Sequence, residues 1–337
     1  MMAKRGAFRS WLWLGVLWFL CLGFVVPGAA LAGDSELEKA TIVLQWLPQA
    51  QFVGYFVAQD KGFYKEEGVS MRILPGGPDV LVSEYLESRR AEYGSMFLVS
   101  GLEKRSKGLN IVHVAQLVQK SALLLVVKKS SSIEKVEDLD GKRVGLWHNE
   151  FQLQARALFK RLGIKVTIVP QSSSMDLFIM GGVDAVSAMW YNELHTLYDS
   201  GLNPDELVVF HYDDPEINLN FPEDGLFCLE ETYRNHPEKT KGVVKATLRG
   251  WEYAFAHQEE ALSILEKYMK LANVPFSYEH QRWMLERMRD IVVPDEGQTM
   301  GVLSQKDYDQ VGKALMEAGF VKKVPSYEDF TREVAHD

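Results

Sequence analysis

The chain alternates short apolar runs with amphipathic stretches from residue 41 onwards. Apolar runs typical of buried strands cover residues 41–46, 69–74, 93–97 and 111–117. Between these runs, apolar residues recur every third or fourth position, as over 52–64, and this spacing predicts helices. Strands that alternate with helices form a mostly parallel sheet with helices on its faces. The first part of the chain is therefore predicted to be an α/β unit.

The same alternation restarts after residue 122 and gives way to a helical region. Strands are predicted over residues 123–128, 143–147, 165–170, 184–190 and 208–211. A polar loop with two prolines covers 213–223, and the strand-like segment 225–229 is expected to return to the first unit. After Pro237 the spacing is almost entirely helical, so this part is predicted to cap an existing sheet.

The chain passes from the first predicted unit to the second and back again. This arrangement predicts two lobes joined by a hinge. Lobe 1 is expected to comprise residues 41–122 and 226–337, and lobe 2 residues 123–225. The predicted class is an α/β two-lobe fold with mixed, mostly parallel sheets and a helical C-terminal part. A ligand would bind in the cleft between the lobes.

Residues 1–32 have the pattern of a secretory signal peptide. Three basic residues precede an uncharged apolar run over 11–26, and the small-residue motif Ala30-Leu31-Ala32 follows. We expect cleavage after Ala32 and export to the periplasm. An uncleaved anchor is the alternative, and it is disfavoured because the apolar run is shorter than a span of ~20 residues.

Composition and charge narrow the possible partners. With 47% hydrophobic and 25% charged residues, the 337-residue chain has the composition of a globular protein. The leader holds Lys4, Arg5 and Arg9 and no acidic residue, so the mature chain keeps 34 basic and 46 acidic residues, a net charge of −12. This charge argues against a nucleic acid or an anionic membrane as partner. Cys228 is the single mature cysteine, which excludes an internal disulfide.

Motifs for common catalytic and cofactor sites are missing from the sequence. The sequence contains no phosphate-binding loop, dinucleotide fingerprint, nucleophile elbow or His-Glu-x-x-His zinc motif. His148-Asn149-Glu150 matches half of the zinc-deaminase motif, but the half with paired cysteines is missing. Cys228 lies in an apolar strand without a nearby His, which is typical of an inert core cysteine. We therefore predict no catalytic residue, metal or cofactor.

Aromatic and amide-carboxylate residues follow several predicted strands. Because ligands bind beyond the carboxyl ends of strands in open α/β sheets, these residues are candidates for a site. Aromatic rings with a few amides and carboxylates suit a planar heteroaromatic ligand that carries N–H donors. A sulfonate site would instead use Arg, Lys or bare helix N-termini. The candidate ligand-binding residues are Trp46, Gln49, Phe52, Tyr55, Gly77, Met96, Asn149, Glu150, Trp190, Tyr191 and Glu193.

Each candidate also has a purely structural interpretation. Trp46 and Tyr55 fit core packing as well as they fit a site. Asn149 fits the cap of the helix that follows it. Glu150 and Glu193 lie in first helical turns, where a carboxylate is favoured by the helix dipole. Only their coincidence at one expected cleft favours binding.

The segment from Leu44 to Ala58, with the Gly62-Phe63-Tyr64 motif after it, resembles a known family. It is similar to the NMT1/THI5-like (SsuA/ThiY-like) solute-binding proteins of ABC importers, and the resemblance covers essentially the whole mature chain. It continues through Gly76-Gly77-Pro78, the turn over 138–142, Asn149-Glu150-Phe151 and the segment 182–185. The resemblance implies a type II periplasmic-binding fold that closes on its ligand.

Within that family, the Trp46-Leu47-Pro48 segment resembles the carriers of aminopyrimidine thiamine precursors. In those carriers aromatic residues stack on the pyrimidine and a carboxylate meets its amino group. The positions here that fall on the matching blocks are Trp46, Tyr55, Asn149, Glu150, Tyr191 and Glu193. The match around 190–193 is the loosest.

A fungal branch of the same superfamily makes the thiamine pyrimidine and consumes an active-site His. That branch carries a His in the turn after the first strand, and a cysteine-rich run later. This chain has Phe52 at the position of that His and only Cys228 later. Both departures argue against synthase chemistry.

We therefore expect a periplasmic, monomeric binding protein that delivers a small planar heteroaromatic nutrient to an ABC permease. An aminopyrimidine thiamine precursor is the favoured ligand. Riboflavin or an alkanesulfonate is the first alternative. A THI5-like pyrimidine synthase is the second, and a sensor module that reports ligand occupancy is the third.

Overall fold

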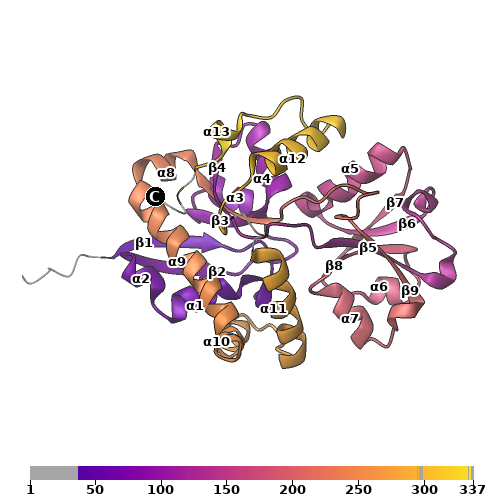
Figure 1. The fold of residues 1–337 in the computed structure, drawn as a ribbon, viewed down its shortest axis with the longest axis horizontal. Coiled ribbons are helices and arrows are strands. Elements are labelled where there is room, and N and C mark those ends of the chain that lie inside the picture. Colours follow the sequence, from indigo (N-terminus) through magenta and orange to yellow (C-terminus); the bar gives the residue numbers. More distant parts are fainter. Residues whose placement is uncertain (1–36, 294, 296–298, 333, 335–337) are drawn as a thin grey trace, which may run out of the picture. The chain divides into compact units, whose positions relative to one another are not determined.

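The computed structural model describes residues 37–293, 295, 299–332 and 334 (Figure 1). The predicted signal peptide, residues 1–32, lies outside these described residues, and its cleavage stays a prediction. Over the described part of the chain, no helix is both long enough and apolar enough to cross a membrane.

In the described part of the chain, ten strands form two five-stranded sheets, and each sheet has its own set of strands. The spatial order in the first sheet is β2 (Val69–Leu74), β1 (Glu38–Val43), β3 (Tyr93–Phe97), β10 (Asp224–Leu229) and β4 (Ile111–Gln116). The order in the second sheet is β7 (Thr167–Gln171), β6 (Arg143–Trp147), β8 (Ala185–Met189), β5 (Leu123–Lys128) and β9 (Leu207–His211).

One strand in each sheet runs against the other four. In the first sheet β1 pairs in parallel with β2 and β3, whereas β10 pairs antiparallel with both β3 and β4. In the second sheet β6 pairs in parallel with β7 and β8, whereas β5 pairs antiparallel with β8 and β9. The predicted fold class, an α/β fold with mixed and mostly parallel sheets, is confirmed.

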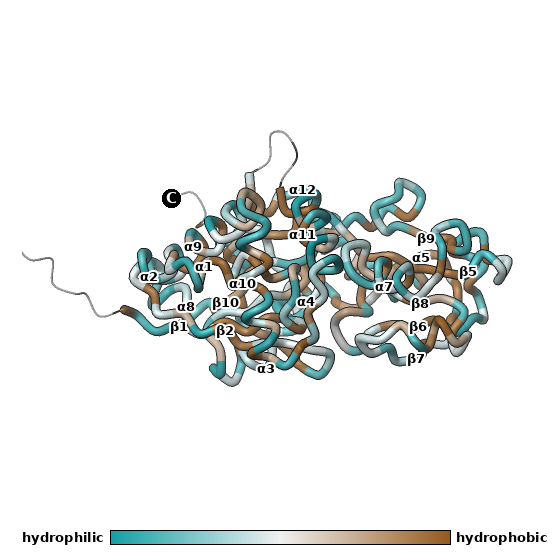
Figure 2. The backbone as a smooth tube through the Cα atoms, turned by 90° about the horizontal axis from the view of Figure 1, so that it is seen from below, coloured by the Kyte–Doolittle hydropathy of each residue, from teal (hydrophilic) through white to brown (hydrophobic). Residues whose placement is uncertain are grey.

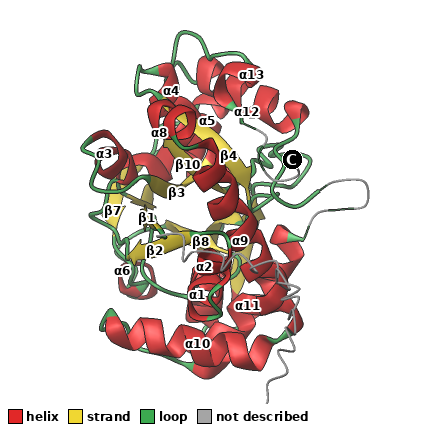
Figure 3. Cartoon of the chain, turned by 90° about the vertical axis from the view of Figure 1, so that its left-hand side faces the viewer, coloured by secondary structure: helices red, strands yellow, loops and turns green. Residues whose placement is uncertain are grey.

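Helices flank the strands in both regions (Figure 3). The helices of the first region are α1 (Val53–Asp60), α2 (Phe63–Glu66), α3 (Val82–Glu87), α4 (Leu98–Ser106), α8 (Glu230–Asn235), α9 (Pro237–Ala256), α10 (Gln258–Leu271), α11 (Tyr278–Val292), α12 (Gln305–Glu317) and α13 (Tyr327–Phe330). The second region has α5 (Leu153–Leu162), α6 (Asp176–Ile179) and α7 (Glu193–Asp199). Short 3-10 helices are η1 (Ala50–Phe52), η2 (Lys129–Ser131), η3 (Val136–Leu139), η4 (Asn149–Gln152) and η5 (Pro204–Glu206).

The helix predicted over 52–64 is divided in two. Helix α1 ends at Asp60, and α2 starts at Phe63 after Gly62, whose φ of 79° lies in the left-handed region that glycine tolerates. Hydrophobic stretches run through the strands, whereas helices such as α10 carry hydrophilic residues beside their hydrophobic ones (Figure 2).

Helix α1 packs against α9 at very short range, which fixes the segment that follows β1. A Cβ built on Gly250 of α9 would lie 2.1 Å from the Gly54 carbonyl oxygen of α1. A Cβ on Gly54 would lie 2.4 Å from the ring of Trp251. Only glycine allows the two backbones to approach this closely. This contact holds α1, and the segment between β1 and α1, in place.

Two crossing segments connect the sheets, one from β4 to β5 and one from β9 to β10. The buried Glu223 joins them, because its carboxylate accepts hydrogen bonds from the backbone N–H of Ala122 (2.7 Å) and Leu123 (3.1 Å) and from the Ser121 hydroxyl (3.1 Å). Burial and the neighbouring Asp224 hold the pKa of Glu223 well above its ordinary value.

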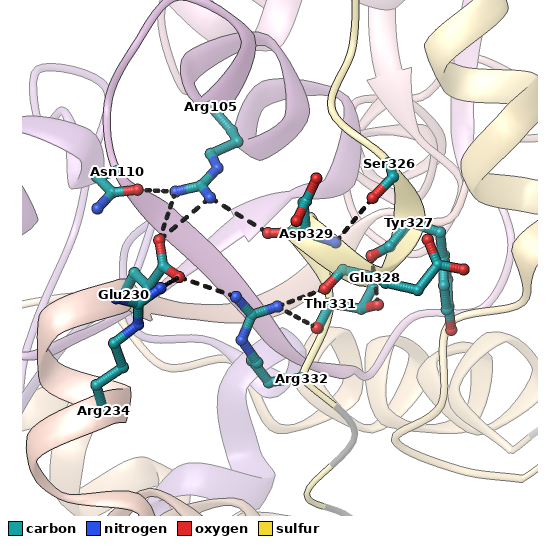
Figure 4. Close-up of polar contacts among 10 residues, drawn as sticks. All are labelled: Arg105, Asn110, Glu230, Arg234, Ser326, Tyr327, Glu328, Asp329, Thr331 and Arg332. Carbon is teal, nitrogen blue, oxygen red and sulfur yellow. Dashed lines mark hydrogen bonds and ion pairs between the residues drawn. The ribbon is translucent and has the colours of Figure 1, made fainter.

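Glu230, at the start of α8, anchors the C-terminal segment (Figure 4). Its carboxylate pairs with Arg105 of α4 at 3.2 Å, with Arg234 at 2.6 Å and with Arg332 at 3.1 Å. Burial acts to raise the pKa of Glu230, but Arg105 and Arg234 hold it below its ordinary value. One carboxylate therefore ties α4, α8 and the residues after α13 together.

Candidate ligand-binding site

A small cavity lies where strands of both sheets end. It is lined by Trp46, Gln49, Gln51, Phe97, Trp147, Phe151, Met189, Tyr191, Asn192 and Glu193. Its volume is about 20 Å³, which is room for roughly one water molecule. The side chains that line it must therefore move apart to admit a small molecule, whose binding sites usually measure ~300–1,000 Å³.

Four strand ends position these side chains. Trp46, Gln49 and Gln51 follow β1, and Phe97 is the last residue of β3. In the second sheet Trp147 ends β6 and Met189 ends β8. The carboxyl ends of strands are where open α/β sheets bind ligands, and here the ends from two sheets line one cavity.

Aromatic rings meet edge to face around the cavity. The Trp46 ring centroid lies 6.3 Å from that of Trp147, with 70° between the ring planes, and 5.4 Å from that of Phe151, at 85°. Phe97 and Phe151 are related in the same way, at 5.4 Å and 86°. Because the rings stand nearly perpendicular, a flat guest that stacks on one of them would meet the edges of the others.

A chain of hydrogen bonds runs along the polar side of the cavity. The buried Asp224 accepts from the amides of Gln45 and Gln51, the latter at 2.8 Å. Gln49 donates to Gln51 at 2.6 Å, and Asn192 of the second region donates to Gln49 at 3.3 Å. Burial raises the pKa of Asp224 to about 7, although both glutamines donate to it. The chain connects polar groups from both regions.

Glu193 supplies a buried carboxyl group to the cavity. Its Oε2 accepts from the backbone N–H of Met189 at 2.9 Å, and its Oε1 accepts from Asn192 Nδ2 at 2.9 Å. Burial raises the pKa of Glu193 to about 7, against the hydrogen bond from Met189. A ligand that brings a proton donor would favour the ionised form of this group.

Over the described residues, the cavity is lined by uncharged side chains and one carboxyl group, that of Glu193. None of the described residues that line it is Lys, Arg or His. The Trp147 Nε1–H is buried and has no hydrogen-bond partner among the described residues. An unpaired buried donor costs about 1–3 kcal/mol, so a ligand that accepts from it would gain that amount.

Of the candidate residues, four line the cavity: Trp46, Gln49, Tyr191 and Glu193. Phe52 and Tyr55 are buried within the packing around α1, and Met96 is buried in β3. Gly77 follows β2, an edge strand, and Trp190 packs against the core with Arg287 over its ring, 5.9 Å from its centroid. The side chains of Asn149 and Glu150 lie outside the described part of the structure.

Six lining residues were absent from the predicted set: Gln51, Phe97, Trp147, Phe151, Met189 and Asn192. Phe97, Trp147 and Met189 are the final residues of their strands. Since side chains alternate between the two faces of a strand, Phe97 and its neighbour Met96 cannot both face the cavity. Taking the final residue of every strand would have found all three.

Comparison with known proteins places the chain in a family. The NMT1/THI5 like family profile matches residues 49–261, which includes every cavity segment except Trp46. The chain belongs to the NMT1/THI5-like family. The predicted resemblance is therefore confirmed.

Relatives within and around this family differ in what their names say they do. A 4-amino-5-hydroxymethyl-2-methylpyrimidine phosphate synthase of Legionella pneumophila is 25% identical over 70% of this chain and 75% of its own. The riboflavin-binding protein RibY of Chloroflexus aurantiacus is 22% identical over 71% of this chain and 69% of its own.

The periplasmic aliphatic sulphonate binding protein SsuA of Escherichia coli shares the fold. It superposes with a TM-score of 0.65 at 16% identity, and the match covers 88% of this chain and 92% of SsuA. The NMT1/THI5-like chain described here thus has the fold of periplasmic binding proteins.

Proposed function

We propose that this NMT1/THI5-like protein is the substrate-binding component of an ABC importer and that it binds a small planar heteroaromatic nutrient. An aminopyrimidine thiamine precursor is the favoured ligand. The observation that carries this proposal is a cavity with nearly perpendicular aromatic walls, three amide side chains and a buried carboxyl group at the strand ends of both sheets. Export by the leader and function as a monomer belong to the same proposal.

The chemistry of the cavity favours an aminopyrimidine over the other two ligands. The ring would stack on an aromatic wall, its amino group would donate to Glu193, and a ring nitrogen would accept from Trp147. A three-ring flavin would force the walls of this small cavity further apart than a single ring would. A sulfonate would find no basic side chain among the described lining residues.

Two lobes, residues 41–122 with 226–337 and residues 123–225, would close around the ligand. A ligand that contacts Trp46 from one side and Tyr191 and Glu193 from the other has more contacts in the closed state, and so it shifts the equilibrium towards closure. The two segments joined by Glu223 would form the hinge. The permease would then recognise the closed form.

Synthase activity is the second candidate, because the Legionella pneumophila relative is named as a pyrimidine phosphate synthase. Against it, no His or Cys is found among the described residues that line the cavity. Phe52 and Cys228 are buried in the core. Iron-dependent turnover of a pyridoxal- or histidine-derived substrate by the purified protein would decide for the synthase.

Calorimetry with the mature protein tests the binding proposal. The titrants are 4-amino-5-hydroxymethyl-2-methylpyrimidine, the same compound without its amino group, riboflavin and an alkanesulfonate. We expect the aminopyrimidine to bind most tightly. Loss of a hydrogen bond to a charged group costs about 1.5–3 kcal/mol, or roughly 10- to 150-fold in affinity.

Glu193→Gln should therefore weaken the aminopyrimidine by that factor and leave the compound without the amino group almost unaffected. Glu87→Gln, an exposed Glu at the end of α3, is the matched control and should bind like the unaltered protein. Equal losses for both pyrimidines in Glu193→Gln would remove the carboxylate from the proposal. If riboflavin or the sulfonate binds more tightly, that compound takes the place of the aminopyrimidine as the proposed ligand.

A further inference from the structure

Three potential metal ligands meet outside the cavity, on helices from the two regions. His195 and Asp199 lie one turn apart on α7, and His280 lies on α11. His195 Nδ1 is 2.9 Å from His280 Nδ1 and 3.2 Å from Asp199 Oδ2. One ligand atom from each residue lies within 4.8 Å of the other two.

The hydrogen-bond chain of the cavity fixes the tautomer of His280. Asn192 uses its Nδ2 to donate to Gln49 and Glu193, so its Oδ1 is left as an acceptor. His280 Nε2, 2.9 Å from that oxygen, must therefore donate to it. The other ring nitrogen, Nδ1, then carries a lone pair, and this lone pair points towards His195 and Asp199.

The ring nitrogens and the carboxylate consequently surround a single proton. His280 Nδ1 and Asp199 Oδ2 are both acceptors, and His195 Nδ1–H is the one donor between them. A divalent cation that replaces this proton would receive two imidazole nitrogens and one carboxylate oxygen. This donor set, with water in the fourth position, is one that Zn²⁺ favours.

We propose that His195, Asp199 and His280 bind a divalent transition metal ion, of which Zn²⁺ fits best, and that the ion joins α7 to α11. Ligand atoms on a tetrahedral zinc ion with bonds of about 2.0–2.1 Å lie roughly 3.3 Å apart. The two distances of 2.9 and 3.2 Å are close to this value. The ligand atoms of His280 and Asp199 lie within 4.8 Å of each other, so these two side chains would approach one another as the ion binds.

Surrounding residues support the proposed ligands. Asn192 holds the second nitrogen of His280, as outer-shell acceptors do in zinc sites. The ring of Trp283 lies 4.6 Å from the ring of His195 and packs against it. Asp199 is largely exposed, with 60% of its side chain accessible, so an ion can enter from solvent.

This assignment does not depend on which small molecule the cavity binds. Asn192 contacts both His280 and the cavity residues Gln49 and Glu193, so the ion would lie one residue away from the ligand. Because α7 follows β8 of the second sheet and α11 packs on η1, which follows β1 of the first, the ion would hold the two regions together.

The test uses the untagged mature protein after dialysis against a chelator. Zn²⁺ is titrated by calorimetry, and Co²⁺ is added separately to read its visible absorption, which is strong in four-coordinate sites. We expect one ion per chain and a four-coordinate Co²⁺ spectrum. Absence of binding, or a spectrum of six-coordinate Co²⁺ only, would overturn the proposal.

Three variants locate the ion. Asp199→Asn, His195→Gln and His280→Gln should each weaken Zn²⁺ binding at least about 10-fold. Asp199→Asn alters an exposed side chain and should keep the thermal melting temperature of the unaltered protein without metal. His211→Gln is the matched control, because His211 also faces an aspartate, Asp213 at 3.8 Å. If His211→Gln weakens binding as much as the other variants, or if Asp199→Asn binds normally, the site is wrong.

Discussion

Replacing Glu193 by glutamine should change the pH dependence of stability. Burial raises the pKa of Glu193 from 4.5 to about 7 in the folded protein. The contribution of the protonated Glu193 carboxyl to the free energy of unfolding is fully present below pH 4.5. This contribution is lost as the pH rises through 7. At pH 8 the folded protein holds a buried carboxylate, whereas glutamine at this position stays uncharged at any pH.

The magnitude follows from the width of this window. Each pH unit between the two pKa values costs about 1.4 kcal/mol, so the complete shift corresponds to roughly 3 kcal/mol. Between pH 5 and pH 8 the unaltered protein should lose about 2.5 kcal/mol through this one group. Glu193→Gln should therefore gain that amount relative to the unaltered protein over the same interval. Asp224, whose pKa is also about 7, is present in both proteins and cancels.

Urea unfolding of the ligand-free protein, followed by tryptophan fluorescence, measures this difference. Both proteins are unfolded at pH 5 and at pH 8 with a chelator present, so that bound metal does not contribute. Glu87→Gln should follow the unaltered protein at both pH values, because its side chain is exposed. A stability difference for Glu193→Gln that is the same at pH 5 and pH 8 would refute the burial argument.

Three further substitutions test other parts of the structure. The Trp46→Ala protein should keep its fold but bind the aminopyrimidine about 1–3 kcal/mol more weakly, since stacking on aromatic rings has this magnitude. Normal binding by calorimetry would contradict stacking of Trp46 on the ligand. Gly250→Ala should lower the free energy of unfolding by about 1–3 kcal/mol, because the new Cβ meets the Gly54 carbonyl oxygen; an unchanged urea midpoint would show that α1 and α9 can separate. Glu230→Gln should cost roughly 3 kcal/mol in urea unfolding at pH 7, because three arginines lose their shared carboxylate. The unaltered protein should lose this contribution only at acidic pH, as the low pKa of Glu230 is passed, so equal stabilities at pH 7 would contradict the anchor.

Strands bounded by turn residues could be predicted closely from the sequence. The ranges 69–74, 93–97, 123–128 and 143–147 agree with β2, β3, β5 and β6. Their apolar runs are short and end at polar or glycine-rich segments, so the boundaries are local properties. The short helices α8 and α13 were not predicted, because six and four residues contain too few turns to show a period.

The candidate site could be predicted in part, because some of its information is not local. The rule that ligands lie beyond strand ends led to Trp46 and Tyr191. The same rule gave Phe52, and the family resemblance gave Tyr55, but both side chains are buried. Helix α1, which carries Tyr55, is covered by α9 from nearly 200 residues later in the chain. His195 and His280 are separated by 85 residues, so only the folded chain brings them together.

The place of β10 between β3 and β4 has a consequence for how the chain matures during synthesis. All five strands of the second sheet lie within residues 123–211, so that sheet can assemble from one continuous stretch. The first sheet cannot, because its fourth strand in spatial order is made last, from residues 224–229. A nascent chain shorter than this exposes two bare strand edges, which are the surfaces that chaperones cover and that aggregate when left open.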